Sequence, residues 1–273
     1  MIDQHEFVRG DRFPNLCDMR VGTESALSYK EQLQIPDQKF VSIYAKTENA
    51  QKAIDIIAQN PQTQFTLVTH NSDLSVCGNP RVPSNLRRWF AQNKDTGHKW
   101  IFPLPIGLEN QHWFPYKEMV MKNTYSEFCD LKQKDRATKV FAQFNPDTHP
   151  ERTLALNQID KDLCDIYSGA NGNASSHGLF CENLMRYAFC LCPRGNGIDT
   201  HRMWEALYMG CIPICKRHHA HEFNNRLPIL FVNEWTDITS ELLFYGHKSV
   251  DLSLFNSDLL KMSYWKKKIS YEI

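Results

Sequence analysis

Short apolar runs alternate with amphipathic segments along most of the chain, a pattern typical of parallel α/β proteins. In the first half the pattern predicts strands at residues 39–44, 64–69 and 99–102, and helices at residues 47–59, 83–92 and 115–132. In the second half it predicts strands at residues 139–144, 187–192, 211–215 and 229–232, and helices at residues 150–165, 179–186 and between 199 and 210. This order predicts an α/β fold with two doubly wound parallel sheets.

The most charged connector of the chain, Lys132 to Arg136, lies between these two groups of elements. We therefore expect one domain of residues 1–134 and a second of residues 135–273, with a last helix that can pack back on the first domain. Ligands of such sheets bind beyond the carboxyl ends of the strands, so a cleft between the two domains is the expected binding place.

Composition and charge exclude several classes of function. Of the 273 residues 42% are hydrophobic, which excludes a disordered chain. Lys and Arg together number 31, as do Asp and Glu, so no net field attracts nucleic acid or an acidic membrane. The nine cysteines are irregularly spaced and are expected to be reduced. No apolar run reaches the ~20 residues of a membrane span and no signal segment stands at the N-terminus, so we expect a cytoplasmic protein.

One segment, Phe189 to Cys215, carries the strongest candidate chemistry. Its residue pattern indicates a buried strand, the glycine loop Pro193-Arg-Gly-Asn-Gly197, a helix and a second buried strand, in that order. Free backbone N–H groups at a helix N-terminus suit an anion, and Arg194 and Arg202 add fork-shaped donors for phosphate oxygens. The same loop can equally be a tight turn without a ligand. Asp199 would repel a phosphate unless its charge is used as a helix cap.

The run PRGNGIDTHRMWEALYMGCIPI, with residues 227–235 and 238–242, resembles the donor-binding half of exostosin-like glycosyltransferases (family 47 and its relatives). The resemblance covers residues 139–245 and extends to xylosyltransferase-type members of viruses and bacteria; a viral member would act in the host cytoplasm. It implies the GT-B architecture of two Rossmann-like domains facing a cleft. It also implies transfer of a sugar from a nucleotide-diphosphate sugar (a UDP-sugar, with UDP-xylose one candidate) to a glycan hydroxyl, with inversion.

The resemblance also implies a set of donor-binding residues in the second half. They are Arg152, Arg194, Asn196, Gly197, Thr200, His201, Arg202 and Glu205. Arg194, Asn196 and Gly197 would hold the diphosphate, and Glu205 would bind the donor ribose. An alternative for Arg202 and Glu205 is an ion pair with each other, since they stand three residues apart on one helix.

An inverting transfer needs a base for the acceptor hydroxyl. Asp73 is the first candidate and His70 the second, because both follow the strand at residues 64–69 and should face the cleft. Asn71-Ser-Asp73 could also form a plain Asx turn.

No metal and no other cofactor are expected. The histidines of His218-His-Ala-His221 lack a carboxylate or cysteine at a fixed spacing, so they are more often solvated than metal-bound. Asp160-Lys-Asp162 matches the D-x-D of metal-dependent transferases, but its pattern is helical.

Two other classes of function stay open. A nucleotide-sugar epimerase should carry G-x-G-x-x-G after its first strand, and residues 45–48 contain no glycine. A non-catalytic module that binds a nucleotide or a glycan would tolerate the loss of Asp73 and His70.

Overall fold

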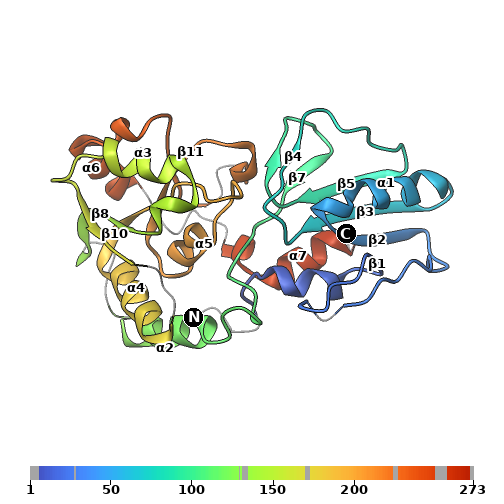
Figure 1. Cartoon of the computed structure of the whole chain (residues 1–273), viewed down its shortest axis with the longest axis horizontal. Helices are drawn as coiled ribbons and strands as arrows, with labels where there is room; N and C mark the ends of the chain where they lie inside the picture. Colours follow the sequence, from blue (N-terminus) through green and yellow to red (C-terminus); the bar gives the residue numbers. More distant parts are fainter. Residues whose placement is uncertain are drawn as a thin grey trace.

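The computed structural model describes residues 6–27, 29–128, 130, 135–169, 173–223, 227–249 and 257–270. Two α/β halves lie side by side along the longest axis of the molecule (Figure 1). Each half is built around a five-stranded sheet in which every described strand pair is parallel.

The first sheet follows the chain order. It consists of β1 (Met19–Val21), β2 (Phe40–Lys46), β3 (Gln64–His70), β5 (Leu86–Ala91) and β7 (Ile101–Pro103), in the order β1-β2-β3-β5-β7. Two further short strands, β4 (Val76–Cys77) and β6 (Lys94–Asp95), pair with each other beside it. Because each strand is added on the same side of the one before, this sheet has no point at which the strand order reverses.

Alternate side chains of the first sheet enter two apolar layers, as the period of a strand requires. Ile43, Leu67 and Trp89 share a cluster with the buried side chains of α1 (Ala50–Gln59). The next residue of each strand (Tyr44, Val68 and Phe90) joins the opposite layer, which contains Phe13 of η1 (Gly10–Leu16) and Trp265 of α7 (Met262–Ile269).

The second sheet contains a reversal of strand order. Its strands are β8 (Ala137–Gln143), β9 (Cys164–Tyr167), β10 (Tyr187–Leu191), β11 (Ile212–Lys216) and β12 (Leu230–Val232), in the order β12-β11-β10-β8-β9. The chain adds β9 on one side of β8 and then β10 on the other. The crevice beyond the carboxyl ends of β8 and β10 is therefore a topological switch point, where open α/β sheets bind their ligands.

Helices cover both faces of the second sheet. One face contacts α3 (Pro150–Gln158) and α6 (Ser240–Ser249), and the other contacts α4 (Ala174–Arg186) and α5 (His201–Tyr208). Gly210 closes α5 at φ +69°, a left-handed conformation that glycine adopts without strain.

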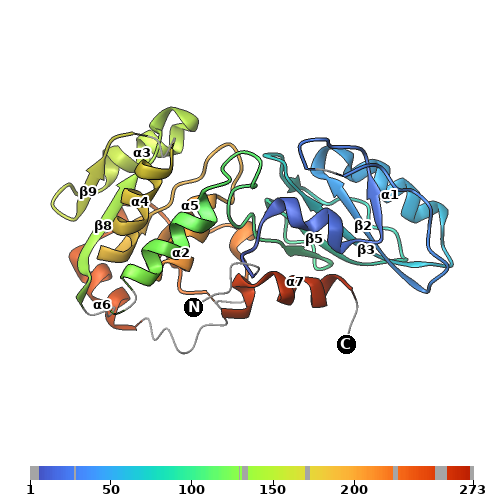
Figure 2. The same cartoon turned by 90° about the horizontal axis from the view of Figure 1, so that it is seen from below.

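Two helices lie away from the half that precedes them in the chain. α2 (Lys117–Glu127) packs against α4 beside the second sheet, and α7 returns to the first sheet (Figures 1 and 2). The ring of Trp265 on α7 lies 6.2 Å from that of Phe90 and 6.4 Å from that of Phe223. One apolar cluster thus runs through both halves. The division of the chain at residue 134 stays a prediction.

The prediction of an α/β fold with two Rossmann-like parallel sheets is confirmed, and two elements within it were predicted wrongly. Residues 86–91 form a central strand and not part of a helix, because β3 and β7 pair with them on both sides. The helix predicted over residues 150–165 ends at Gln158, and Cys164–Tyr167 form the edge strand β9. Within the described residues, no helix has the length and apolar character needed to cross a membrane.

Candidate active site

A cavity of about 480 Å³ lies at the switch point, beyond the ends of β8 and β10. We call it the larger cleft cavity. The second half provides the loop after β8, the first turns of α3 and α5, and residues 195–197 of the glycine loop. The first half and the segment that crosses between the halves provide Asp73, Ile106, Glu109, Phe114 and Lys117. The cavity is therefore built from both halves.

Two arginines of the larger cleft cavity form no ion pair with a described carboxylate. The guanidinium of Arg202 lies over the rings of Phe144 and Phe180, at 5.3 and 5.9 Å, and its buried Nε has no hydrogen-bond partner. Arg152 donates to the carbonyl oxygens of Arg194 and Asn145 at 3.1 and 3.0 Å. Neither arginine forms an ion pair with any carboxylate that the structure describes.

The two arginines repel each other. Burial, and after it the positive charge of Arg202, lowers the pKa of Arg152 to about 10. Glu205 offsets part of this charge, since Arg202 is among the groups that lower its pKa. A bound anion would offset the remainder. Phosphate oxygens match the guanidinium of Arg202 and the Nη2 of Arg152, since the Nε and Nη1 of Arg152 already donate within the protein.

The guanidinium of Arg194 does not line the cavity, although the sequence predicted it as a phosphate-binding group. Its guanidinium folds back on its own loop and donates to the carbonyl oxygens of Asn196 and Gly195, at 2.8 and 3.3 Å. Its side chain does not line the larger cleft cavity, whereas Gly195, Asn196 and Gly197 do. Through its own carbonyl oxygen, Arg194 instead holds Arg152 in position.

The glycine loop touches the first half directly. A Cβ at Gly197 would lie 2.7 Å from the amide nitrogen of Asn93, so only glycine fits there without a shift. The amide oxygen of Asn93 accepts the backbone N–H of Asp199 at 2.9 Å. A residue of the first half thereby fixes the entry to α5.

Asp199 does not cap α5. Its carboxylate accepts the backbone N–H of Ile106 at 2.8 Å and the indole N–H of Trp204 at 2.9 Å. Burial raises its pKa to about 7 in spite of these donors. Thr200 is the N-cap residue, and its side chain makes no capping bond. The N–H groups of the first turn are therefore not satisfied by a side-chain cap at this position.

Glu205 pairs with Lys117 and not with Arg202. The Lys117 Nζ lies 2.8 Å from the Glu205 carboxylate, and both side chains are buried. Burial alone would raise the pKa of Glu205, but the charge and hydrogen bond of Lys117, together with the charges of His177 and Arg202, outweigh it and the pKa falls to about 2. Both groups line the larger cleft cavity, so the carboxylate is ionised and firmly held at its wall.

His201 forms a second charged pair. Its Nδ1–H donates to the carbonyl oxygen of Gly107 at 2.8 Å, and its Nε2 lies 3.2 Å from Oε1 of Glu109. Burial alone would lower the pKa of His201, but Glu109 outweighs it and the pKa is raised. Burial alone would raise the pKa of Glu109, but the charge of His201 lowers it. The pair is therefore an imidazolium and a carboxylate.

A second cavity of about 330 Å³ adjoins the first, beyond the carboxyl ends of β2 and β3. We call it the smaller cleft cavity. It is lined by the amide side chains of Asn71, Gln92 and Asn110 and by Trp113, which is 66% exposed. Four residues line both cavities: Asp73, Ile106, Glu109 and His201. The two carboxylates among them stand at the junction.

The two predicted base candidates differ in accessibility. Asp73 is exposed at the junction of the two cleft cavities. His70 is the last residue of β3 and fully buried. Its Nε2–H donates to the Pro105 carbonyl oxygen at 2.9 Å, and its Nδ1 accepts the backbone N–H of Asn71 at 2.7 Å. Burial lowers its pKa to about 4, so His70 is a neutral structural residue.

The motifs considered for metal binding are dispersed. His218 contacts Asp95, His219 contacts Glu222, and His221 is buried. Asp160 and Asp162 lie in an exposed turn before β9, not in a helix as expected. No group of three or more possible metal ligands occurs in the described part of the chain.

Sequence reasoning missed Glu109, Lys117 and Asn93. Their partners lie 92, 88 and 106 residues away in the chain, so no local spacing connects them. Glu109 follows the Pro103-Leu-Pro-Ile-Gly107 turn after a predicted strand, and this position at a strand end was the available signal.

Comparison with known proteins adds little beyond the fold. No protein-family model and no curated protein matches the chain. Among solved structures it is similar to "Crystal Structure of alpha1,3-Fucosyltransferase", with 14% identity and a TM-score of 0.42, over 87% of this chain and 74% of that one. At that identity and TM-score the likeness does not bear on activity or substrate. The exostosin-like resemblance stays a prediction.

Proposed function

We propose that the protein is a glycosyltransferase that moves a sugar from a nucleotide-diphosphate sugar to a glycan hydroxyl. The observation that carries the proposal is the pair Arg152 and Arg202, which face one cavity at a topological switch point without a carboxylate partner. A diphosphate is an anion of suitable charge for these two guanidinium groups. A UDP-sugar, with UDP-xylose as one candidate, is the donor that the exostosin-like resemblance suggests.

The adjoining smaller cleft cavity would take the acceptor. Its amide side chains are fixed by hydrogen bonds to one another and to the backbone, which gives the cavity a rigid polar wall. Trp113 offers an exposed aromatic face on which a sugar ring can stack. Because this cavity shares residues with the larger one, an acceptor hydroxyl there can approach the anomeric carbon of a bound donor.

Direct displacement with inversion requires a carboxylate at the junction of the cavities. Glu109 and Asp73 both stand there, and we place Glu109 first. Its Oε1 is held by His201, which leaves Oε2 to take the acceptor proton, and the carboxylate is ionised at neutral pH. The lowered pKa makes it a weaker base in the free protein, so the assignment rests on its position and fixed orientation. Arg152, Arg202 and the N–H groups that begin α5 would stabilise the departing diphosphate, so that no metal is required.

The base assignment is tested by Glu109→Gln and Asp73→Asn, which keep the shape of each side chain and remove its basicity. Turnover of Glu109→Gln should fall about 10²–10⁴-fold while donor affinity stays the same. Asp73→Asn is the matched control, because Asp73 lines the same two cavities. The opposite result, loss only in Asp73→Asn, would restore Asp73 as the base.

The activity itself is tested with UDP, GDP and their sugars. A ligand at 100 times its Kd should stabilise the fold by about 2.7 kcal/mol, which a thermal-shift assay detects. Release of the nucleotide diphosphate in the presence of oligosaccharide acceptors would then report transfer. Binding without release under any acceptor would favour the non-catalytic module, and the absence of nucleotide binding would refute the proposal.

A further inference from the structure

A third cavity, of about 360 Å³, lies where β6 and β7 of the first half face β11 and β12 of the second. We call it the edge cavity. Its size lies within the range of small-molecule sites. It shares no lining residue with either cleft cavity. Lys94 lines it, while the preceding residue, Asn93, holds the glycine loop. Two consecutive residues, Asn93 and Lys94, therefore connect the glycine loop of the larger cleft cavity with the lining of the edge cavity.

An ion pair and a histidine–carboxylate contact at the edge cavity join the halves. Lys94 Nζ lies 2.7 Å from the Glu222 carboxylate, and His218 Nε2 lies 3.1 Å from that of Asp95. Burial lowers the pKa of His218, so this imidazole does not balance the charge of Asp95. The lining contains two further cations.

Those cations are Lys99 of the first half and Arg217 of the second, and both line the edge cavity. Neither forms an ion pair with a described residue. Their charged groups lie only over rings, Lys99 at 5.4 Å from that of Trp100 and Arg217 at 4.8 Å from that of Phe231. Two exposed cations from opposite halves thus face one cavity with apolar walls.

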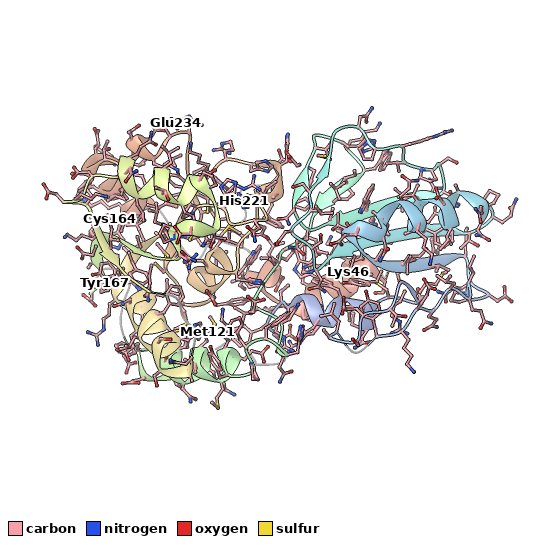
Figure 3. The ribbon with its side chains drawn as sticks, viewed as in Figure 1. Lys46, Met121, Cys164, Tyr167, His221 and Glu234 are labelled. Atoms are coloured by element: carbon pink, nitrogen blue, oxygen red, sulfur yellow. The ribbon has the colours of Figure 1, made fainter. Side chains whose placement is uncertain are left out.

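A buried ring nitrogen provides an independent indication of a ligand. His221 also lines the edge cavity, is only 8% exposed, and has an Nδ1 without a hydrogen-bond partner. Its ring stacks on Phe231 at 6.2 Å, and Figure 3 places it beside the junction of the two halves. A buried polar atom without a partner is costly in a folded protein, so its partner should come from outside the chain.

We propose that the edge cavity binds a sugar phosphate, with the phosphate between Lys99 and Arg217 and a sugar hydroxyl donating to Nδ1 of His221. The cations come from both halves, so the bound phosphate would tie the halves together outside the cleft. This site is independent of the donor site proposed above.

The site can be tested by isothermal titration with glucose 1-phosphate and with inorganic phosphate. The variant Lys99→Ala/Arg217→Ala removes two exposed cations and should fold normally. Its control is Lys39→Ala/Arg186→Ala, which removes a lysine and an arginine that also lie over rings and line none of the three cavities described above, although Arg186 in addition pairs with Glu182. A second control, Arg202→Met, disables the larger cleft cavity.

Glucose 1-phosphate should bind the wild type, the Lys39→Ala/Arg186→Ala control and Arg202→Met alike, and bind Lys99→Ala/Arg217→Ala at least tenfold more weakly. Inorganic phosphate should bind more weakly than glucose 1-phosphate. Three results would overturn the proposal: no binding by the wild type at millimolar concentration, loss of binding in Arg202→Met, or equal binding in the Lys99→Ala/Arg217→Ala variant and its Lys39→Ala/Arg186→Ala control. Equal affinity for the two probes would overturn the contact between the sugar and His221.

Discussion

Arg202→Met is the sharpest test of the larger cleft cavity. Methionine keeps an unbranched stem over Phe144 and Phe180 and removes only the charged end. Because the Nε of Arg202 has no partner within the protein, the change breaks no described hydrogen bond in the free protein. The cost should therefore appear in the complex with a nucleotide diphosphate and not in the fold.

The expected magnitude follows from the lost charge-assisted contact. Such hydrogen bonds contribute about 1.5–3 kcal/mol, and about 1.4 kcal/mol corresponds to a tenfold change in affinity. Nucleotide affinity should fall by about tenfold to a hundredfold. The free energy of unfolding of the unliganded protein should change little, because the relief of Arg152 from a like charge is offset by the loss of a favourable charge beside Glu205. A loss of affinity without a comparable loss of stability distinguishes an anion site from ordinary packing.

Isothermal titration with UDP and GDP measures the affinity, and urea unfolding measures the stability. Arg186→Met is the control for affinity, since Arg186 also lies over a ring and lines neither cleft cavity; its ion pair with Glu182 makes it unsuitable as the control for stability. Arg194→Met should weaken binding less than Arg202→Met, because the Arg194 guanidinium contacts its own loop. Unchanged nucleotide affinity in a folded Arg202→Met protein, or a larger loss in Arg194→Met, would refute the assignment.

Two further predictions concern buried charges at the same site. Lys117→Met leaves the Glu205 carboxylate buried without its partner, so the free energy of unfolding should fall by about 3–5 kcal/mol. The double variant Lys117→Met/Glu205→Gln should recover most of that loss. A double variant as unstable as Lys117→Met would contradict the pairing. Asp199 has an ordinary pKa of 3.8 and a folded value of about 7, so the folded state binds the extra proton between these values. The unfolding free energy should therefore fall as pH rises from about 4 to about 7, by up to about 1.4 kcal/mol per pH unit, and Asp199→Asn should remove this slope in urea unfolding series. Identical slopes in the two proteins would show that Asp199 is ionised throughout.

The sequence predicted four of the five strands of the second sheet, all but β9, because the signals of these four are local. Apolar strands, a glycine loop and the terminating Gly210 lie within one continuous segment, Phe189 to Cys215, and the structure folds that segment as expected. Residues 86–91 show where local signals fail. Pro83 and Ser84 resemble a helix start, but the strand is fixed by hydrogen bonds to β3 and β7, which the local pattern does not contain.

Some residues of the predicted donor site line the cavity and others do not, because the sequence does not show the direction of a side chain. A loop sequence shows that Arg194 is near an anion site, but not whether its guanidinium points into the cavity or back to the loop. Arg152 shows the reverse case. Its first-turn position on α3 looks unfavourable beside a helix dipole, and the structure places it in the cavity wall because the Arg194 carbonyl oxygen holds it there.

The crossing segment between the halves links the two cavities mechanically. Ile106, Glu109, Phe114 and Lys117 all come from the stretch that leaves the first sheet after β7 and enters α2. Gly107 fixes the start of this stretch, with φ +67° and a position where a Cβ would lie 2.1 Å from the Val8 carbonyl oxygen. The same stretch is joined to α5 by two charged pairs, Glu109 with His201 and Lys117 with Glu205. Contacts with both halves therefore fix the position of the proposed base at the junction of the two cavities.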